Sequence, residues 1–330
     1  MKETLKTLSN RLGLSPSTVS RVLSGKAEQF RISEKTVAMI LEEARKTGFV
    51  PNQLAQSLRT KNTSTIGIIV PDLSNAFFGT LAHTIISLLK SNGYQTLVME
   101  SREEEEEEMA LAHNFVARNV DGLIVIPVGN SPAYLERINE DLPVVLADRY
   151  FDNSQLSYVT ADNRLGGKLA AQCLMEAGYS RILSIQGNPL SMPNQIRLQG
   201  FSETLAQKPD IVHTVVGSSF SSENGYNSVM EMLGGGKKMD AVFAYSVTIL
   251  QGALRALREL GYRIPEDIGV IAYDDNSFYD YLNPPITRVC QPLLIMGRMV
   301  VETLQKKISE GNKDTVQLLA EPYLIRGKSC

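Results

Sequence analysis

The sequence predicts an α/β protein in which a small helical headpiece precedes a large core of two doubly wound parallel sheets. Its 330 residues are more than a single hydrophobic core usually serves. From Thr65 onward, continuous apolar runs of strand length alternate with amphipathic helical stretches, which indicates parallel sheets covered on both faces. More than eight such strands are expected, so the core is predicted to contain two sheets.

Changes of pattern along the chain set the expected domains. A headpiece is expected over 1–48, a hinge helix and linker over 49–62, and a core over 63–330. Within the core we expect two interleaved subdomains, approximately 63–160 plus 292–325 and 161–291. The late stretch TRVCQP offers the return crossover between them.

Composition favours an ordinary globular protein. Hydrophobic residues make up 43% of the chain, and no apolar run approaches the roughly 18–20 residues that span a membrane. The first ten residues lack the apolar segment of a signal peptide, so we expect a cytoplasmic protein. The three cysteines and three histidines are scattered without CxxC or HExxH spacing, so no metal site and no cofactor are expected.

Charge is distributed unevenly. Residues 1–62 carry eleven Lys or Arg against five Asp or Glu, while the remainder carries twenty-two against thirty-one. A basic headpiece on an acidic core suggests that the headpiece meets a polyanion, whereas the alternative is chance surface charge.

The headpiece is predicted to contain three short helices. Gly13, Gly25 and Gly48 mark their ends, and Ser15 and Ser33 are expected to begin the second and third. The residues expected to be buried are Leu5, Leu8, Leu12, Val19, Val22, Leu23, Val37, Ile40, Leu41 and Ala44. The turn between the first two helices is three residues long and contains glycine, as in a helix-turn-helix.

The second helix presents a polar face opposite its valines. Ser17, Thr18 and Arg21 lie at i, i+1 and i+4 on that face. Small hydroxyl groups approach base edges and phosphates closely, and arginine pairs with guanine through two hydrogen bonds. The face therefore favours DNA recognition over the alternative of a plain three-helix bundle.

The stretch FVPNQLAQSLRT, residues 49–60, is predicted to be a marginal helix that begins at Asn52. It is shorter than the roughly 12–15 residues that an isolated helix needs in water. Leu54, Ala55 and Leu58 form one narrow apolar stripe on it.

In the core, the expected helices cover 76–92, 104–118, 164–177, 195–207 and 249–260. The expected strands are TIGIIVPD, YQTLVMES, DGLIVIP, LPVVLADR, YVTAD, RILSIQG, HTVVGSS, DAVFAYS and DIGVIAYDD. The acidic run 103–108 opens a helix, where negative charge suits the helix dipole, and is interpreted as a solvated face.

Ligands of open parallel sheets bind beyond the carboxyl ends of the strands. The residues at those ends are Asp72, Asn75, Phe77, Phe78, Asp148, Arg149, Tyr245, Ser246, Asp274 and Asp275. Carboxylates and amides hydrogen-bond sugar hydroxyls, and aromatic faces cover the apolar side of a ring. The set suits a polar small ligand enclosed between two lobes.

The chain lacks the spacing of common catalytic and nucleotide-binding motifs. No GxGxxG follows a strand and no GxSxG occurs, while GGGKKM has Glu231 and Lys238 where a phosphate loop needs Gly and Ser or Thr. Asp274 and Asp275 are the nearest pair to a glycosidase arrangement, but adjacent strand residues point to opposite faces. We therefore expect no catalytic residues and no enzyme.

An ordered set of motifs resembles the LacI/GalR (lac repressor/galactose repressor) family of bacterial transcription regulators. TLKTLSNRLGLSPSTVSRVLSG resembles its helix-turn-helix, PNQLAQSL its hinge, and TIGIIVPDLSNAFFGTLAHTI its first core strand and helix. NVDGLIVIP, VTADNRLGGKLAAQCLMEAGYSRI, RLQGF, GYRIPEDIGVIAYDD and PPITRVCQPLLIMG continue the match in order over essentially the whole chain.

The resemblance implies a repressor with a core like that of periplasmic sugar-binding proteins, a palindromic operator, and a small effector, most often a sugar. The implied DNA contacts are Thr4, Ser15, Ser17, Thr18, Ser20 and Arg21 in the headpiece and Asn52, Ala55 and Leu58 in the hinge. The implied effector contacts are Asn75, Phe77, Asp148, Arg197, Ser246, Asp274 and Gln291, to which the strand ends add Phe78, Arg149 and Tyr245. The end of the chain has no heptad repeat, so a homodimer is expected.

The sequence departs from the family pattern at two places. QFRIS lengthens the connection before the third helix, and AYSVTILQG lacks the acidic residue of the family's NDxxAxG segment, which leaves Tyr245 as a rival to Ser246. Two other function classes compete with a regulator. A transport-type ligand-binding protein predicts an export signal and no headpiece, and a sugar-modifying enzyme needs a catalytic pair, and the sequence supports neither.

Overall fold

The computed structural model describes residues 4–49, 62–311 and 314–330. The chain divides into two compact units, Met1–Thr63 and Ser64–Cys330. The hinge predicted around Asn52, Ala55 and Leu58 lies outside the described residues.

The first unit is a bundle of α1 (Leu5–Leu12), α2 (Pro16–Leu23) and α3 (Glu34–Thr47). Thr4, Ser15 and Ser33 cap the three helices at their N-termini, and Gly13 and Gly48 adopt the left-handed conformation that ends α1 and α3. The core of the bundle consists of Leu8, Val19, Val22, Ile40 and Ala44. The prediction that Leu41 is buried is wrong, because its side chain faces solvent and is 50% exposed.

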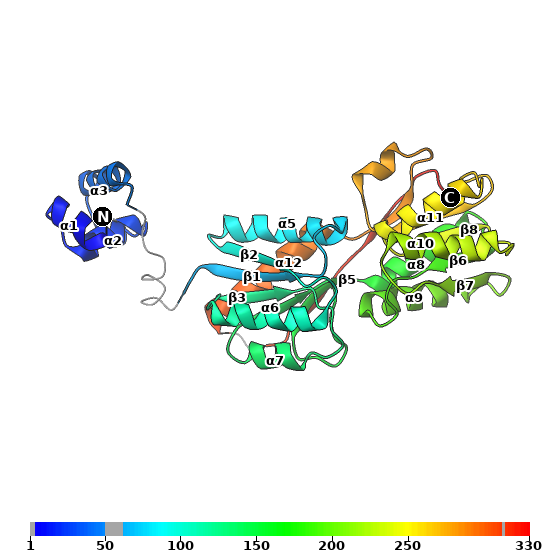
Figure 1. Cartoon of the computed structure of the whole chain (residues 1–330), viewed down its shortest axis with the longest axis horizontal. Coiled ribbons are helices and arrows are strands. Elements are labelled where there is room, and N and C mark those ends of the chain that lie inside the picture. The colour runs from blue at the N-terminus through cyan, green and yellow to red at the C-terminus, as the bar shows by residue number, and fades with distance from the viewer. Residues whose placement is uncertain (1–3, 50–61, 312–313) are drawn as a thin grey trace. The chain divides into compact units, whose positions relative to one another are not determined.

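The second unit contains two lobes, each built on a six-stranded sheet (Figure 1). The N-terminal lobe has the strand order β11-β5-β4-β3-β1-β2, and all its neighbours pair in parallel. Its strands are β1 (Thr65–Val70), β2 (Gln95–Glu100), β3 (Gly122–Val125), β4 (Val144–Ala147), β5 (Ser157–Ala161) and β11 (Gln317–Ala320). Its helices are α5 (Ala76–Ser91), α6 (Glu105–Ala117), α7 (Ala133–Asn139) and α12 (Leu293–Glu310).

The C-terminal lobe repeats this arrangement with the order β12-β10-β9-β8-β6-β7. Its strands are β6 (Arg181–Ile185), β7 (Val212–Val216), β8 (Ala241–Ala244), β9 (Gly269–Tyr273), β10 (Thr287–Cys290) and β12 (Tyr323–Ile325). Its helices are α8 (Asn163–Glu176), α9 (Met192–Leu205), α10 (Ser222–Val229), the π-helix η1 (Met230–Gly234), α11 (Val247–Glu259) and the 3-10 helix η2 (Ser277–Tyr281). The strand β12 pairs antiparallel with β10, the one departure from a parallel sheet among the strands described here.

The chain passes between the lobes after β5, after β10 and after β11 (Figure 1). Consequently α12 covers the N-terminal sheet although it follows the C-terminal strands, and it packs mainly against α5. The prediction of an α/β core of two doubly wound sheets is confirmed. The elements that are missing from the predicted helices and strands are α7, α10, α12, β10, β11, β12 and the short helices η1 and η2.

Candidate functional site: a cleft between the lobes

Residues from both lobes line one cleft with a free volume of about 30 Å³, which holds a few water molecules at most. The N-terminal lobe contributes Asn75, Phe77, Phe78, Asp148 and Arg149, and the C-terminal lobe contributes Ser191, Pro193, Arg197, Phe220, Ser246, Asp274 and Gln291. The cleft lies beyond the carboxyl ends of the strands, where open parallel sheets bind ligands.

Two carboxylates occupy equivalent positions in the two lobes. Asp148 directly follows β4 and Asp274 directly follows β9, and each backbone N–H donates to the neighbouring strand, at Val159 and Val289 respectively. Both residues have positive φ, 60° and 73°, which is uncommon for residues other than glycine. Strain of this kind concentrates at functional sites, where the surrounding structure holds it in place.

The two carboxylates sit in one electrostatic environment. Burial raises the pKa of Asp148 to about 7, although the nearby guanidinium groups of Arg149 and Arg197 favour its charged form. Burial also raises the pKa of Asp274, which Arg197 and the amide of Gln291 oppose. The protein therefore solvates the charged form of both groups poorly.

Arg197 on α9 is fixed by groups of the C-terminal lobe. Its two terminal nitrogens donate to the Tyr245 carbonyl at 2.6 Å and to Asn163 Oδ1 at 2.7 Å, and its guanidinium lies 3.3 Å from the ring centre of Tyr273. Its Nε is buried with no hydrogen-bond partner among the described residues. One donor of this arginine is thus left without a hydrogen bond in the protein.

Gln291 and Arg149 complete the polar lining. Gln291 Nε2 donates to Asp274 Oδ1 at 2.7 Å, and its Oε1 is buried without a partner in the described part of the chain. Arg149 forms a two-pronged ion pair with Glu103, with N···O distances of 2.7 and 2.8 Å. The Arg149 guanidinium lies 5.2 Å from the ring centre of Phe78 and 5.9 Å from that of Phe220.

Three helix N-termini also reach the cleft, that of α5 from the N-terminal lobe and those of α9 and α11 from the C-terminal lobe. Asn75 caps α5 by accepting from the Phe77 N–H at 3.0 Å, and Ser246 caps α11 by accepting from the Ile249 N–H at 3.2 Å. The phenyl rings of Phe77 and Phe78 meet edge to face. The cleft therefore combines carboxylates, amides and hydroxyls with aromatic faces.

The structure brings together nine of the ten effector contacts that the sequence predicted. Tyr245 does not line the cleft, because its side chain is fully buried beside Phe243 in the C-terminal core. The sequence reasoning missed Ser191, Pro193 and Phe220. A signal for Phe220 existed, since this aromatic follows the end of β7, just beyond the HTVVGSS stretch.

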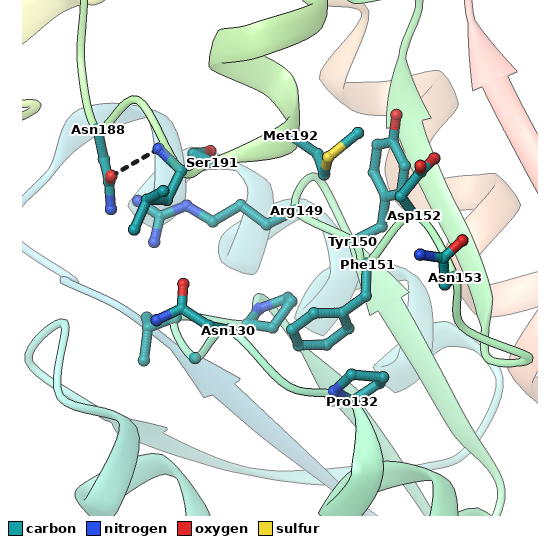
Figure 2. Close-up of a pocket in the computed structure, with 14 residues that line it drawn as sticks. Asn130, Pro132, Arg149, Tyr150, Phe151, Asp152, Asn153, Asn188, Ser191 and Met192 are labelled. Carbon is teal, nitrogen blue, oxygen red and sulfur yellow. Dashed lines mark hydrogen bonds between the residues drawn. The ribbon is translucent and has the colours of Figure 1, made fainter.

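A second cavity of about 270 Å³ adjoins the cleft and shares Arg149 and Ser191 with it. Figure 2 shows Arg149 between the segment at Asn130 and the segment at Asn188 and Ser191, with Phe151 nearby. The lining is polar and aromatic, and it comes from both lobes. A ligand of the cleft therefore has room to extend past Arg149.

The acidic run 103–108 is only partly a solvated face, which corrects the sequence interpretation. Glu108 is fully buried and does not face solvent. Its carboxyl oxygens accept hydrogen bonds from the Tyr134 hydroxyl and the Val128 N–H. Burial raises its pKa to about 7. Glu103 holds Arg149 at the cleft.

Asp275, the neighbour of Asp274, points away from the cleft, as expected for adjacent residues of a strand. Its carboxylate pairs with Arg288 at 2.7 Å.

The headpiece residues predicted to touch DNA lie around α2. Ser15, Ser17 and Arg21 are exposed, and Ser15 Oγ lies 2.8 Å from both the Ser17 and the Thr18 hydroxyl oxygens. Thr4 is exposed at the start of α1, and Ser20 is half-buried. The structure thus gathers the hydroxyl groups at the N-terminus of α2.

No helix within the described residues is both long and apolar enough to cross a membrane.

A family model described as a periplasmic binding protein domain matches residues 66–313. The chain is 30% identical to the ribose operon repressor of Haemophilus influenzae, an alignment that covers 99% of this chain and 98% of that protein. It is 31% identical to the transcriptional regulator CelR of Thermobifida fusca, with 98% and 97% of the two chains covered.

Solved structures agree with these relatives. The complex of the transcriptional regulator CelR with cellobiose matches with a TM-score of 0.74 and 28% identity, covering 99% of this chain and all of that one. The lac repressor dimer bound to operator matches in fold, with a TM-score of 0.88 and 24% identity over 100% and 99% of the chains. The relatives are transcription regulators. This chain accordingly belongs to the LacI/GalR family of bacterial transcription regulators.

Proposed function

We propose that the protein is a homodimeric repressor whose affinity for a palindromic DNA operator is controlled by a small effector, a sugar or related metabolite, bound in the cleft. The observation that carries the proposal is the cleft itself. Its two buried carboxylates come from equivalent positions in two lobes, and a basic helix-turn-helix unit is part of the same chain. The operator places its site of action in the cytoplasm.

The headpiece supports DNA binding through charge and shape. Ser17 and Arg21 are exposed on α2, and a helix of this kind enters the major groove with its N-terminal residues toward the bases. Two headpieces in a dimer read two half-sites, so the symmetry of the operator mirrors that of the protein. Neutralised phosphates release counterions, and operator affinity is expected to fall steeply with salt.

The cleft supports control by an effector. Asp148 belongs to the N-terminal lobe and Arg197 and Asp274 to the C-terminal lobe, so a ligand that contacts all three favours one relative position of the lobes. Couplings between such sites are typically worth about 1–3 kcal/mol. The named relatives include a ribose operon repressor and a regulator solved with cellobiose, which favours a sugar as the ligand class.

The test is a fluorescence-anisotropy titration of the full chain on DNA from upstream of its own gene and of adjacent genes. We expect specific binding at moderate salt, and a change in affinity when the sugars used by the neighbouring genes are added. If the protein binds specifically but no candidate ligand changes its affinity, the proposed control by an effector is contradicted. If it shows no specific binding, the proposed repressor function is contradicted.

Two variants separate the sites. Arg21→Ala is expected to weaken operator binding and leave effector binding unchanged, whereas Asp274→Ala is expected to do the opposite. Loss of both activities in both variants, with folding intact by circular dichroism, would contradict the separate assignment.

A further inference from the structure

Several hydrogen-bond acceptors line the cleft. The carboxylates of Asp148 and Asp274 are buried there, and the buried Oε1 of Gln291 has no hydrogen-bond partner within the described residues. Two buried donors that line the cleft also lack a partner within the described residues, the hydroxyl of Ser191 and the Nε of Arg197. The terminal nitrogens of Arg197 already bond Tyr245 and Asn163. A buried acceptor without a partner is costly, so the cleft favours a ligand whose O–H groups donate to these acceptors.

The one guanidinium at the mouth of both cavities is already occupied. Both terminal nitrogens of Arg149 bond the carboxylate of Glu103, at 2.7 and 2.8 Å. This is the fork-to-fork geometry that arginine otherwise uses for a phosphate group. Glu103 and Arg102 both have positive φ, 59° and 55°, in the turn before α6, which indicates that the turn is held in this shape.

The side-chain charges around Asp148 also oppose an anion. The charged groups that act on Asp148 are the guanidinium groups of Arg149 and Arg197 and the carboxylates of Asp274 and Glu103. Counting Asp148 itself, three acidic groups face two cations. A phosphate group would add negative charge beside the carboxylates of Asp148 and Asp274.

We infer that the cleft takes an uncharged, polyhydroxylated effector, and that the ion pair between Glu103 and Arg149 excludes the phosphate esters of the same sugars. Sugar hydroxyls donate to the carboxylates and to Gln291, and one of them accepts from Arg197 Nε. The aromatic rings of Phe77, Phe78 and Phe220 cover the C–H faces. The inference rests on the proposed function for the location of the effector site.

The test uses matched pairs of a free sugar and its monophosphate with the full chain: ribose and ribose 5-phosphate, fructose and fructose 1-phosphate, glucose and glucose 6-phosphate, with neutral disaccharides added. Calorimetry is expected to show a neutral ligand that binds at least tenfold more tightly than its ester. An ester that binds as tightly as the free sugar overturns the inference, as does a panel in which no neutral compound binds. A neutral ligand that binds without altering operator affinity supports the inference and contradicts the proposed function.

The variant Glu103→Gln tests the role of the ion pair directly. It removes the carboxylate from Arg149 and is expected to raise affinity for the phosphate esters at least tenfold while neutral-sugar affinity changes less than threefold. Glu106→Gln is the matched control, because Glu106 is an exposed member of the same acidic run. Unchanged ester affinity in Glu103→Gln, with an unaltered melting temperature, overturns the role of the ion pair.

In the headpiece, an arginine of α2 lies over an aromatic ring. The guanidinium carbon of Arg21 on α2 lies 3.8 Å from the ring centre of Phe30, which belongs to the lengthened connection between α2 and α3. Phe30 is 43% exposed, so the hydrophobic core of the bundle does not account for its position. Backbone bonds from Phe30 to Lys26 and from Ile32 to Ala27 hold this connection in a compact turn.

We propose that Phe30 is a positioning residue for Arg21 in DNA recognition. Stacking on a ring leaves the edge of a guanidinium free for paired hydrogen bonds, such as those to guanine, and reduces the rotamer freedom that is lost on binding. In the described part of the headpiece Arg21 has no acidic partner that competes with this role.

The experiment compares Phe30→Ala, Phe30→Tyr and the wild-type chain on operator DNA and on random-sequence DNA. Phe30→Ala is expected to lose at least fivefold in operator affinity with less than a twofold change on random DNA, and Phe30→Tyr is expected to retain wild-type behaviour. Equal losses on both DNAs, or a lowered melting temperature of the headpiece that accounts for the loss, would show a purely structural role and overturn the proposal.

Discussion

Asp148 connects the geometry of the cleft to an expected pH dependence. Burial raises the pKa of its carboxyl to about 7, so the group changes its charge in the neutral range. Hydroxyl donors of a ligand stabilise the ionised form, and binding is therefore favoured once the proton has left. Effector affinity is expected to rise about tenfold from pH 6 to pH 8, since the ionised fraction of such a group changes by about that factor. Calorimetry in matched buffers at pH 6 and pH 8 measures this change in effector affinity.

The control for this pH dependence is Asp148→Asn, which cannot ionise. We expect weaker binding with a flatter pH profile, in which the remaining slope comes from Asp274, whose pKa burial also raises. A wild-type affinity that stays constant between pH 6 and pH 8 would contradict the ionised carboxylate as a ligand contact.

At the scale of elements, the close approach of α8 and α9 positions Arg197. A Cβ added at Gly167 on α8 would lie 2.1 Å from the carbonyl oxygen of Arg197, and one at Gly200 on α9 would lie 2.1 Å from that of Arg164. Both contacts are with backbone, so the helices would have to separate. Gly167→Ala is expected to lower the free energy of unfolding by about 1–3 kcal/mol and to weaken effector binding, because Arg197 moves with α9.

Chemical denaturation and calorimetry check this expectation. Gly234→Ala is the matched control, because a Cβ there meets only Leu260 Cδ2 at 3.7 Å, an ordinary contact. The idea fails if Gly167→Ala is as stable as the control and binds effector normally.

The elements also show what the sequence can and cannot predict. Apolar runs predicted β1 and β4 and hence the strand ends that carry Asn75 and Asp148, because burial on both faces leaves a plain signal. The strands β11 and β12 are short, half-exposed edge strands, which carry little such signal. The partner of Glu103 is set by the tertiary position of Arg149, 46 residues away, so the charge run alone indicated only solvent exposure.

At the scale of the whole molecule, the chain passes between the lobes three times, and ligand contacts are divided between them. A ligand that favours one relative position of the lobes therefore acts on the whole N-terminal lobe. The strand β1 of that lobe begins at Thr65, shortly after the stretch predicted to be the hinge. In the sequence, the predicted hinge therefore lies directly between the headpiece and the first strand of this lobe.

This connection leads to a prediction about Leu58, a residue outside the described ranges whose hinge role rests on the family resemblance. An apolar side chain inserted between base pairs unstacks the step and kinks the duplex, and contacts to the bent DNA repay the cost. Leu58→Ser is expected to abolish tight operator binding by the full-length dimer, while effector affinity remains that of the wild type. Anisotropy on operator DNA and calorimetry with the effector measure the two quantities separately. Leu73→Ser serves as the control, because Leu73 lies in the second unit and its side chain is already 44% exposed. If Leu58→Ser binds the operator as tightly as the wild type, the headpieces alone account for binding. That result would contradict a role of the hinge in the coupling between effector and DNA.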